Sequence, residues 1–89
     1  MENNAYAVYL VATSNEILNE KLENGIVIDG MLEINYDDGE MVFTGDDRIA
    51  LRYNEVSIEA DGFYFTDGTS YYRFANEAPN VIKAVKKNG

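Results

Sequence analysis

The 89-residue chain contains no cysteine and no histidine. Without cysteine it has no disulfide bond and no thiolate to act as a metal ligand or nucleophile, which is compatible with a reducing compartment. Without histidine it lacks the residue most often used as a general base, as a metal ligand and as a pH switch near neutrality. These two absences exclude the commonest catalytic and metal-binding assemblies.

Basic residues are scarce, because seven Lys and Arg stand against sixteen Asp and Glu and give a net charge of −9. Such a charge repels phosphate backbones and anionic lipids, so we expect no direct binding of nucleic acid or membrane. The apolar stretch at 5–12 is far shorter than the ~20 residues of a membrane span, and no basic segment precedes it. We therefore expect a cytoplasmic protein, and its length predicts one domain with little room for a deep cavity.

Four Asp-Gly pairs, at 29–30, 38–39, 61–62 and 67–68, separate segments in which apolar and polar residues alternate. This combination predicts β-hairpins with type I′ turns, in which both turn residues have positive φ. The first pair fits either a turn or a bulge within one long strand. The stretch at 5–12 is apolar on both faces and favours a buried strand, although a buried helix has the same signal.

Two helices complete the expected α+β fold, a curled antiparallel sheet or small barrel of six to seven strands. Thr13 and Glu16 have the spacing of a capping box, and Asn24-Gly25 supplies a stop, which together predict a short helix near 14–24. A second helix is expected near 77–87, where lysines suit the negative C-terminal end. This helix would cap the sheet.

The segment 30–87 resembles the bacterial pleckstrin-homology and GRAM-like superfamily. The resemblance is carried by Gly-Met-Leu-Glu-Ile at 30–34, Glu-Met-Val-Phe at 40–43, the segment 49–58, and the aromatic strands at 61–65 and 69–74. It implies a pleckstrin-homology-like roll closed by a C-terminal helix. Such proteins usually bind peptides, other proteins or lipid headgroups and are rarely enzymes.

Two features of the chain depart from that superfamily. The helix near 14–24 is an addition between the first two strands, so a generic α+β roll remains the alternative fold. Headgroup recognition needs an early basic cluster, and residues 22–47 contain neither Lys nor Arg. Lipid binding is therefore not expected.

Acidic and aromatic residues provide the candidate partner-binding surface. The acidic stretch would attract a basic partner, although the same charge would also serve solubility alone. Outward tyrosines are frequent interface anchors, although they also stabilise sheets as cross-strand pairs. Tyr36, Tyr53 and Tyr72 fall on the inward register, which predicts core positions. The candidate partner-binding residues are Glu33, Asp37, Asp38, Glu40, Asp46, Asp47, Tyr64 and Tyr71.

The sequence predicts no metal, cofactor or enzymatic activity. An EF-hand loop that begins at Glu33 would need glycine at its sixth position and an acid at its twelfth, where the chain has Asp38 and Thr44. At most, the carboxylates of the turn near Asp38 would hold a divalent ion loosely. There is no phosphate-binding glycine loop and no Gly-x-Ser-x-Gly elbow.

We therefore expect a stand-alone, non-enzymatic module that binds another protein with a basic surface. On the analogy of size and charge, its most concrete form is an inhibitor of the phage anti-defence or toxin-immunity type. A structural subunit that associates with itself or a partner through a sheet edge is one alternative. A weak hydrolase that uses a pair of carboxylates is another.

Overall fold

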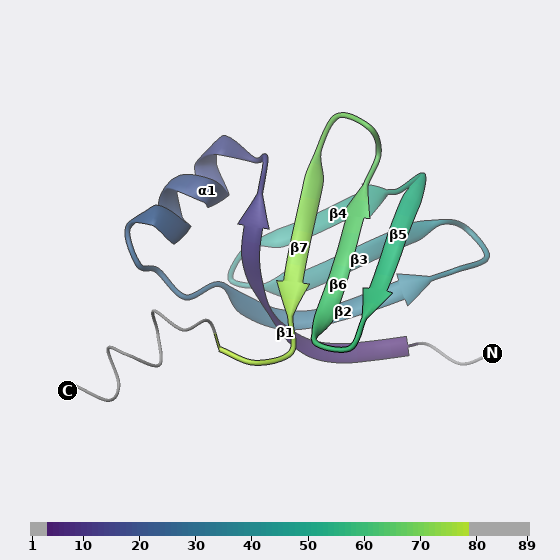
Figure 1. Cartoon of the computed structure of the whole chain (residues 1–89), viewed down its shortest axis with the longest axis horizontal. Coiled ribbons are helices and arrows are strands. Elements are labelled where there is room, and N and C mark those ends of the chain that lie inside the picture. Colours follow the sequence, from purple (N-terminus) through teal and green to yellow (C-terminus); the bar gives the residue numbers. More distant parts are fainter. Residues whose placement is uncertain (1–3, 79–89) are drawn as a thin grey trace.

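The computed structural model describes residues 4–78, which form a seven-stranded antiparallel sheet and one short helix (Figure 1). The strand order is β4-β3-β2-β1-β7-β6-β5, and the sheet is not closed. The expected small, sheet-rich α+β class is confirmed, whereas the helix expected near 77–87 lies outside the described residues except for Glu77 and Ala78. The elements are β1 (Asn4–Thr13), α1 (Glu16–Glu23), β2 (Asp29–Asn35), β3 (Glu40–Gly45), β4 (Arg48–Arg52), β5 (Glu55–Glu59), β6 (Gly62–Thr66) and β7 (Tyr71–Ala75).

The long strand β1 joins the two halves of the sheet. Its residues 4–9 pair with β2, whereas residues 9–13 pair with β7, and the register shifts between Leu10 and Ala12. Because its two ends have different partners, the sheet folds over on itself. Figure 1 shows β5, β6 and β7 crossing in front of β2, β3 and β4. The strand expected at 5–12 is confirmed, and the helical alternative is wrong. Its expected burial is only partly met, because Val8 and Leu10 are the buried residues of this stretch.

The hydrophobic core lies between these two halves. Phe43 on β3 faces Phe74 on β7, with 5.1 Å between the ring centroids, and Phe65 on β6 lies 6.1 Å from Phe74. All three rings are fully buried or nearly so. Strands β2, β3 and β7 contribute alternate residues to this core, because successive side chains of a strand point to opposite faces.

The two edges of the sheet, β4 and β5, follow one another in the chain and are joined by only Tyr53 and Asn54. The Tyr53 N–H donates to the Gly39 carbonyl in the β2–β3 turn, at 2.9 Å, and the Asn54 N–H donates to the Thr66 carbonyl of β6, also at 2.9 Å. This corner is therefore attached to both halves of the sheet.

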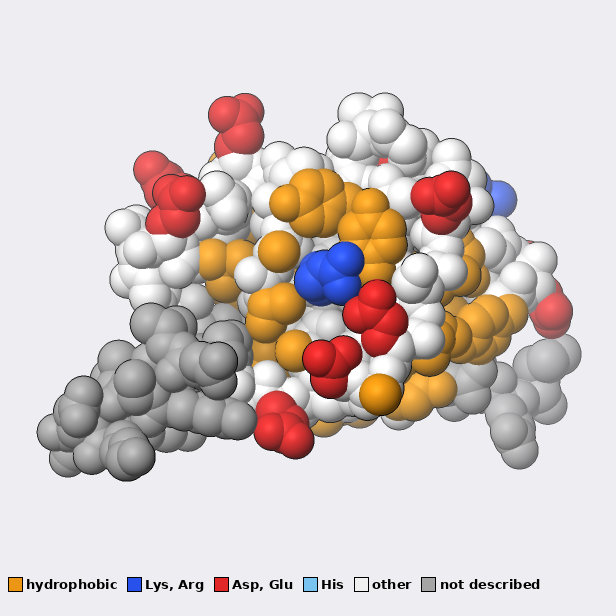
Figure 2. Space-filling view, viewed as in Figure 1, with side chains coloured by type: hydrophobic (Ala, Val, Ile, Leu, Met, Phe, Trp, Pro, Cys, Tyr) orange, Lys and Arg blue, Asp and Glu red, His pale blue; other side chains and the backbone are white. Residues whose placement is uncertain are grey.

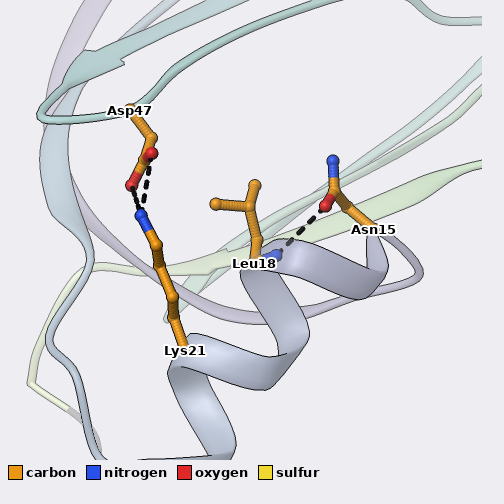
Figure 3. Close-up of polar contacts among 4 residues, drawn as sticks. All are labelled: Asn15, Leu18, Lys21 and Asp47. Atoms are coloured by element: carbon orange, nitrogen blue, oxygen red, sulfur yellow. Dashed lines mark hydrogen bonds and ion pairs between the residues drawn. The ribbon is translucent and has the colours of Figure 1, made fainter.

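Helix α1 confirms the short helix expected near 14–24, but its N-terminal cap differs from the prediction. Asn15 is the N-cap, and its Oδ1 accepts the Leu18 N–H at 3.1 Å (Figure 3). Thr13 ends β1, where its hydroxyl donates to the Tyr71 carbonyl at 2.9 Å and accepts the Asn15 N–H at 3.0 Å. The capping box between Thr13 and Glu16 is wrong because β7 engages the threonine.

Three of the four Asp-Gly pairs mark hairpin turns. Asp38-Gly39 and Asp67-Gly68 lie in turns, and Asp61 precedes β6. The type I′ assignment is wrong, because among residues 4–78 only glycines have positive φ. Asp29-Gly30 lies within β2 in regular register with β1, and Gly30 also pairs with Gly45 of β3, so the pair is neither a turn nor a bulge. Gly30 is needed for close approach, since a Cβ there would overlap the Thr44 carbonyl.

The carboxylate of Asp67 holds the β6–β7 turn through hydrogen bonds, so we expect the protein to lose stability in acid. Asp67 Oδ1 accepts the N–H groups of Ser70, at 2.7 Å, and Thr69, at 2.9 Å, and these bonds lower the pKa of Asp67 below its usual value. A lowered folded-state pKa contributes stability above the unfolded value of about 3.9, and this contribution is lost as pH falls through the folded pKa. We expect Asp67→Asn to lower the free energy of unfolding near neutrality. The difference in this free energy between variant and wild type should shrink below about pH 4.

Urea unfolding midpoints measured across this pH range test the prediction. Asp37→Asn is the matched control, because Asp37 is an exposed turn residue for which the described part of the chain shows no hydrogen bond from a backbone N–H. Equal pH dependence of the two variants would contradict a specific role for Asp67.

Candidate partner-binding surface

The acidic candidates lie at opposite ends of β3. Asp37 and Asp38 occupy the β2–β3 turn, whereas Asp46 and Asp47 occupy the β3–β4 turn. Because β3 has six residues, its two ends are separated by roughly 17 Å. The two turns therefore present separate acidic surfaces, and Glu33, exposed on β2, lies between them.

Asp47 has a structural partner. The Lys21 Nζ of α1 lies 3.0 Å from Asp47 Oδ1 and 3.1 Å from Oδ2 (Figure 3). The two side chains are 37% and 30% exposed, so the pair contributes at most about 1 kcal/mol to stability. It ties α1 to the β3–β4 turn, which makes Asp47 less available to a partner than its neighbour Asp46.

The β2–β3 turn combines acidic charge with an exposed aromatic side chain. Tyr36 is 47% exposed and is followed directly by Asp37 and Asp38, with Glu40 at the start of β3. Asp38 is held by Asn35, whose Nδ2 donates to Asp38 Oδ2 at 2.9 Å and whose Oδ1 accepts the Asp38 N–H at 3.1 Å. We call Tyr36, Asp37, Asp38 and Glu40 the acidic turn.

The three tyrosines expected in the core have different environments. Tyr72 is buried and Tyr53 is half-buried against the core, whereas the inward assignment of Tyr36 is wrong because β2 ends one residue before it. Desolvation raises the pKa of Tyr36, and the nearby phenols of Tyr6 and Tyr53 raise it further. The phenols of Tyr6 and Tyr53 therefore lie near that of Tyr36, a relation that the strand register alone would not reveal.

Tyr64 and Tyr71 lie together on the outer face of β6 and β7, as expected. Their ring centroids are 6.0 Å apart, and the Arg73 guanidinium lies 5.0 Å from the centroid of Tyr64. Arg73 Nη1 also donates to Glu59 Oε1 at 3.2 Å. Figure 2 shows this face, where hydrophobic side chains surround one basic group with acidic side chains beside it. Because these residues bind one another, cross-strand stabilisation of the sheet accounts for part of their arrangement.

Two shallow grooves on the described part of the chain have volumes of about 330 Å³ each. One lies between α1 and β4 and contains the carboxylate of Asp47; the other lies over β1 and β2 and contains that of Asp29. Neither groove holds a pair of carboxylates. Within residues 4–78, no three acidic side chains converge in a group that could hold a metal ion.

Helix α1, the one helix described for residues 4–78, is not long and apolar enough to cross a membrane. No protein-family model, curated protein sequence or solved structure matches the chain.

Proposed function

We propose that this chain is a non-enzymatic module that binds another protein through the acidic turn. The observation that carries the proposal is the exposure of Tyr36 beside Asp37 and Asp38. Tyrosine is enriched among the residues that dominate interface energies. Carboxylates around such an anchor would steer a basic partner and fix its orientation.

The most concrete form of this module is a cytoplasmic inhibitor of the phage anti-defence or toxin-immunity type. The high acidity of so small a chain supports this form, because a negative surface can occupy the basic site of a nucleic-acid-binding enzyme. Figure 2 shows acidic side chains at several places on one face. The partner would therefore be recognised by its positive surface.

We further propose that the fold is a pleckstrin-homology-like roll. The strand order supports this, because β1–β4 and β5–β7 are two successive meanders that β1 and β7 join. The helix expected near 77–87 would complete the roll.

Reversing the charge of the acidic turn tests the proposed function. With a partner recovered in stoichiometric amounts from the native host, we expect Asp37→Lys combined with Asp38→Lys to weaken binding at least ~10-fold, because like charges would then meet across the interface. Wild-type binding should also weaken as salt is raised. Titration calorimetry at several salt concentrations measures both effects.

The opposite end of β2 and β3 offers a matched control. Asp29 and Asp46 are both exposed, so Asp29→Lys combined with Asp46→Lys makes the same change of net charge away from the acidic turn. We expect this control to lose much less affinity. Recovery of no stoichiometric partner, or equal losses in the two double variants, would reject the acidic turn as the binding site.

An assembly subunit is a second candidate function, favoured by the two open edges of the sheet. Within residues 4–78, β4 pairs only with β3, and β5 pairs only with β6. Open edges of this kind can accept another strand.

A further inference from the structure

The two open edges carry opposite charges. Strand β4 reads Arg-Ile-Ala-Leu-Arg, and β5 reads Glu-Val-Ser-Ile-Glu. Arg48 and Arg52 are two of only four basic residues within 4–78, and both are exposed. No ion pair within that range engages Arg48, Arg52 or Glu55, whereas Glu59 meets Arg73 at 3.2 Å. One edge of this acidic chain is therefore cationic and the other is anionic.

The hydrogen bonds of β4 show which backbone groups face its open edge. The Tyr53 N–H donates to Gly39, which lies beside β3. Along a strand the N–H and C=O of successive residues point alternately to the two sides. Ile49 and Leu51 therefore also direct these groups at β3, and the groups of Arg48, Ala50 and Arg52 point to the open edge. The side chains of these three lie on the outer, solvent face of the sheet.

The same reasoning applies to β5. The Asn76 N–H donates to the Asp61 carbonyl, so the backbone groups of residues 61, 63 and 65 face β7 and those of 62, 64 and 66 face β5. Their partners in β5 are residues 59, 57 and 55, which therefore bond to β6. The backbone groups of Val56 and Ile58 point to the open edge, and their side chains lie on the inner face, opposite Phe65 and Phe63.

In β4 the residues whose backbone groups face the open edge have outer-face side chains, whereas in β5 they have inner-face side chains. This difference determines whether the two edges can pair in parallel or antiparallel. Residues opposite one another in an antiparallel pair share a face, and their backbone groups point either both toward each other or both away. Antiparallel pairing would therefore put Val56 and Ile58 of one copy on the solvent face of another. In a parallel pair, a residue that faces the partner bonds to the residues before and after its opposite number. Parallel pairing lets Ala50 lie opposite Ser57 while it bonds to Val56 and Ile58.

We propose that β4 of one copy of this chain pairs in parallel with β5 of a second copy. Arg48 then lies opposite Glu55 of the second copy and Arg52 opposite its Glu59, so both solvent-face pairs join opposite charges. On the inner face, Ile49 and Leu51 lie opposite Val56 and Ile58.

Exposed apolar side chains at both edges support a second copy as the occupant. Ile58 is 56% exposed although it is on the inner face, because no strand covers that edge within the described residues. Beside β4, the groove of about 330 Å³ is lined by Ile49, Ala50 and Ile17 of α1, and Ile17 is 72% exposed. The added strand would lie against this groove and shield both isoleucines.

Because the two paired surfaces differ, the contact is heterologous and leaves a free β4 and a free β5 at the ends of a dimer. Further copies would extend it into an open chain or a ring. This inference rests on the second candidate function. The contact between β4 and β5 does not include the acidic turn, so the double change at Asp37 and Asp38 should leave self-association unaltered.

Charge reversal tests the pairing in the full-length protein. We expect the wild-type mass, measured by sedimentation, to rise from one chain toward two or more between about 10 μM and 1 mM and to fall with added salt. Arg48→Glu with Arg52→Glu, or Glu55→Arg with Glu59→Arg, should weaken association at least ~10-fold. The first change makes the chain more acidic and the second less acidic, so loss in both excludes an effect of net charge. Equimolar mixing of the two variants should restore association.

Cross-linking tests the parallel register directly, because the native chain has no cysteine. Mixed Ala50→Cys and Ser57→Cys variants, one of them tagged, should form a mixed disulfide dimer in preference to either homodimer. Thr44→Cys, exposed on β3 and one strand away from the edge, replaces Ala50→Cys as the control. A constant one-chain mass for folded wild type, failure of the mixture to recover association, or equal cross-linking by the control would overturn the proposal.

Discussion

Phe43→Ala is expected to lower the free energy of unfolding by about 3–5 kcal/mol. The Phe43 side chain is 0% exposed and packs on Phe74, with 5.1 Å between ring centroids, so it joins β3 to β7 across the folded sheet. Truncation removes this contact from both halves and leaves a cavity that the paired backbones cannot close. Small domains have total stabilities of about 5–15 kcal/mol, so this loss would bring the chain close to unfolding. Urea unfolding followed by circular dichroism measures it.

Tyr36→Ala is the matched control for Phe43→Ala, since it also truncates an aromatic side chain. Tyr36 is 47% exposed in the β2–β3 turn, and we expect its truncation to change stability by only about 0.5 kcal/mol. Phe43→Leu should give an intermediate loss, because it keeps most of the buried volume. Similar losses in Phe43→Ala and Tyr36→Ala would contradict the assignment of the core to the space between β3 and β7.

The core was predictable wherever strands alternate apolar and polar residues. Met41 and Phe43 on β3, and Phe63 and Phe65 on β6, are buried as their period of two predicts. Ile58 follows the same period but is half-exposed, because it lies on an edge strand. The period identifies the face of a residue, and strand order, which depends on contacts distant in sequence, decides how well that face is covered.

Local turn signals were less reliable than periodicity, for two physical reasons. Gly30 allows the close approach of Thr44 on the neighbouring strand, which is a tertiary requirement. Because Asp29 precedes it, the same glycine has the sequence pattern of a turn. Thr13 has the spacing of a capping box, but it bonds to the Tyr71 carbonyl 58 residues away, and Asn15 caps the helix instead. In both cases a distant strand competes successfully with the local motif.

The candidate surface was predictable in composition but not in arrangement. Register alone placed Tyr64 and Tyr71 together on one face, because residues on adjacent strands that share a face are neighbours. The acidic residues at 37–38 and 46–47 are close in sequence, yet β3 holds them at opposite ends. The core position predicted for Tyr36 is wrong because the environment of this residue depends on where β2 ends.

Gly62→Ala is expected to destabilise the fold by about 1–3 kcal/mol, the usual cost of overpacking. Gly62 is buried at the start of β6, opposite Ala75 of β7, and a Cβ there would overlap the Phe74 carbonyl. The φ of Gly62 is not positive, so the cost comes from space and not from backbone conformation. Relief would require β6 and β7 to separate beside the bond from the Asn76 N–H to Asp61. Urea unfolding midpoints of the variant and wild type measure the effect.

Gly25 provides the contrast that separates these two causes. It has φ of +81° and open space where a Cβ would stand, so Gly25→Ala should cost about 1–2 kcal/mol through conformation alone. Asparagine tolerates the left-handed region better than alanine, so Gly25→Asn should recover part of that loss. At Gly62 asparagine relieves nothing and adds volume, so Gly62→Asn should be at least as destabilising as Gly62→Ala. If asparagine were better than alanine at both positions, close packing between β6 and β7 would not be what requires glycine at position 62.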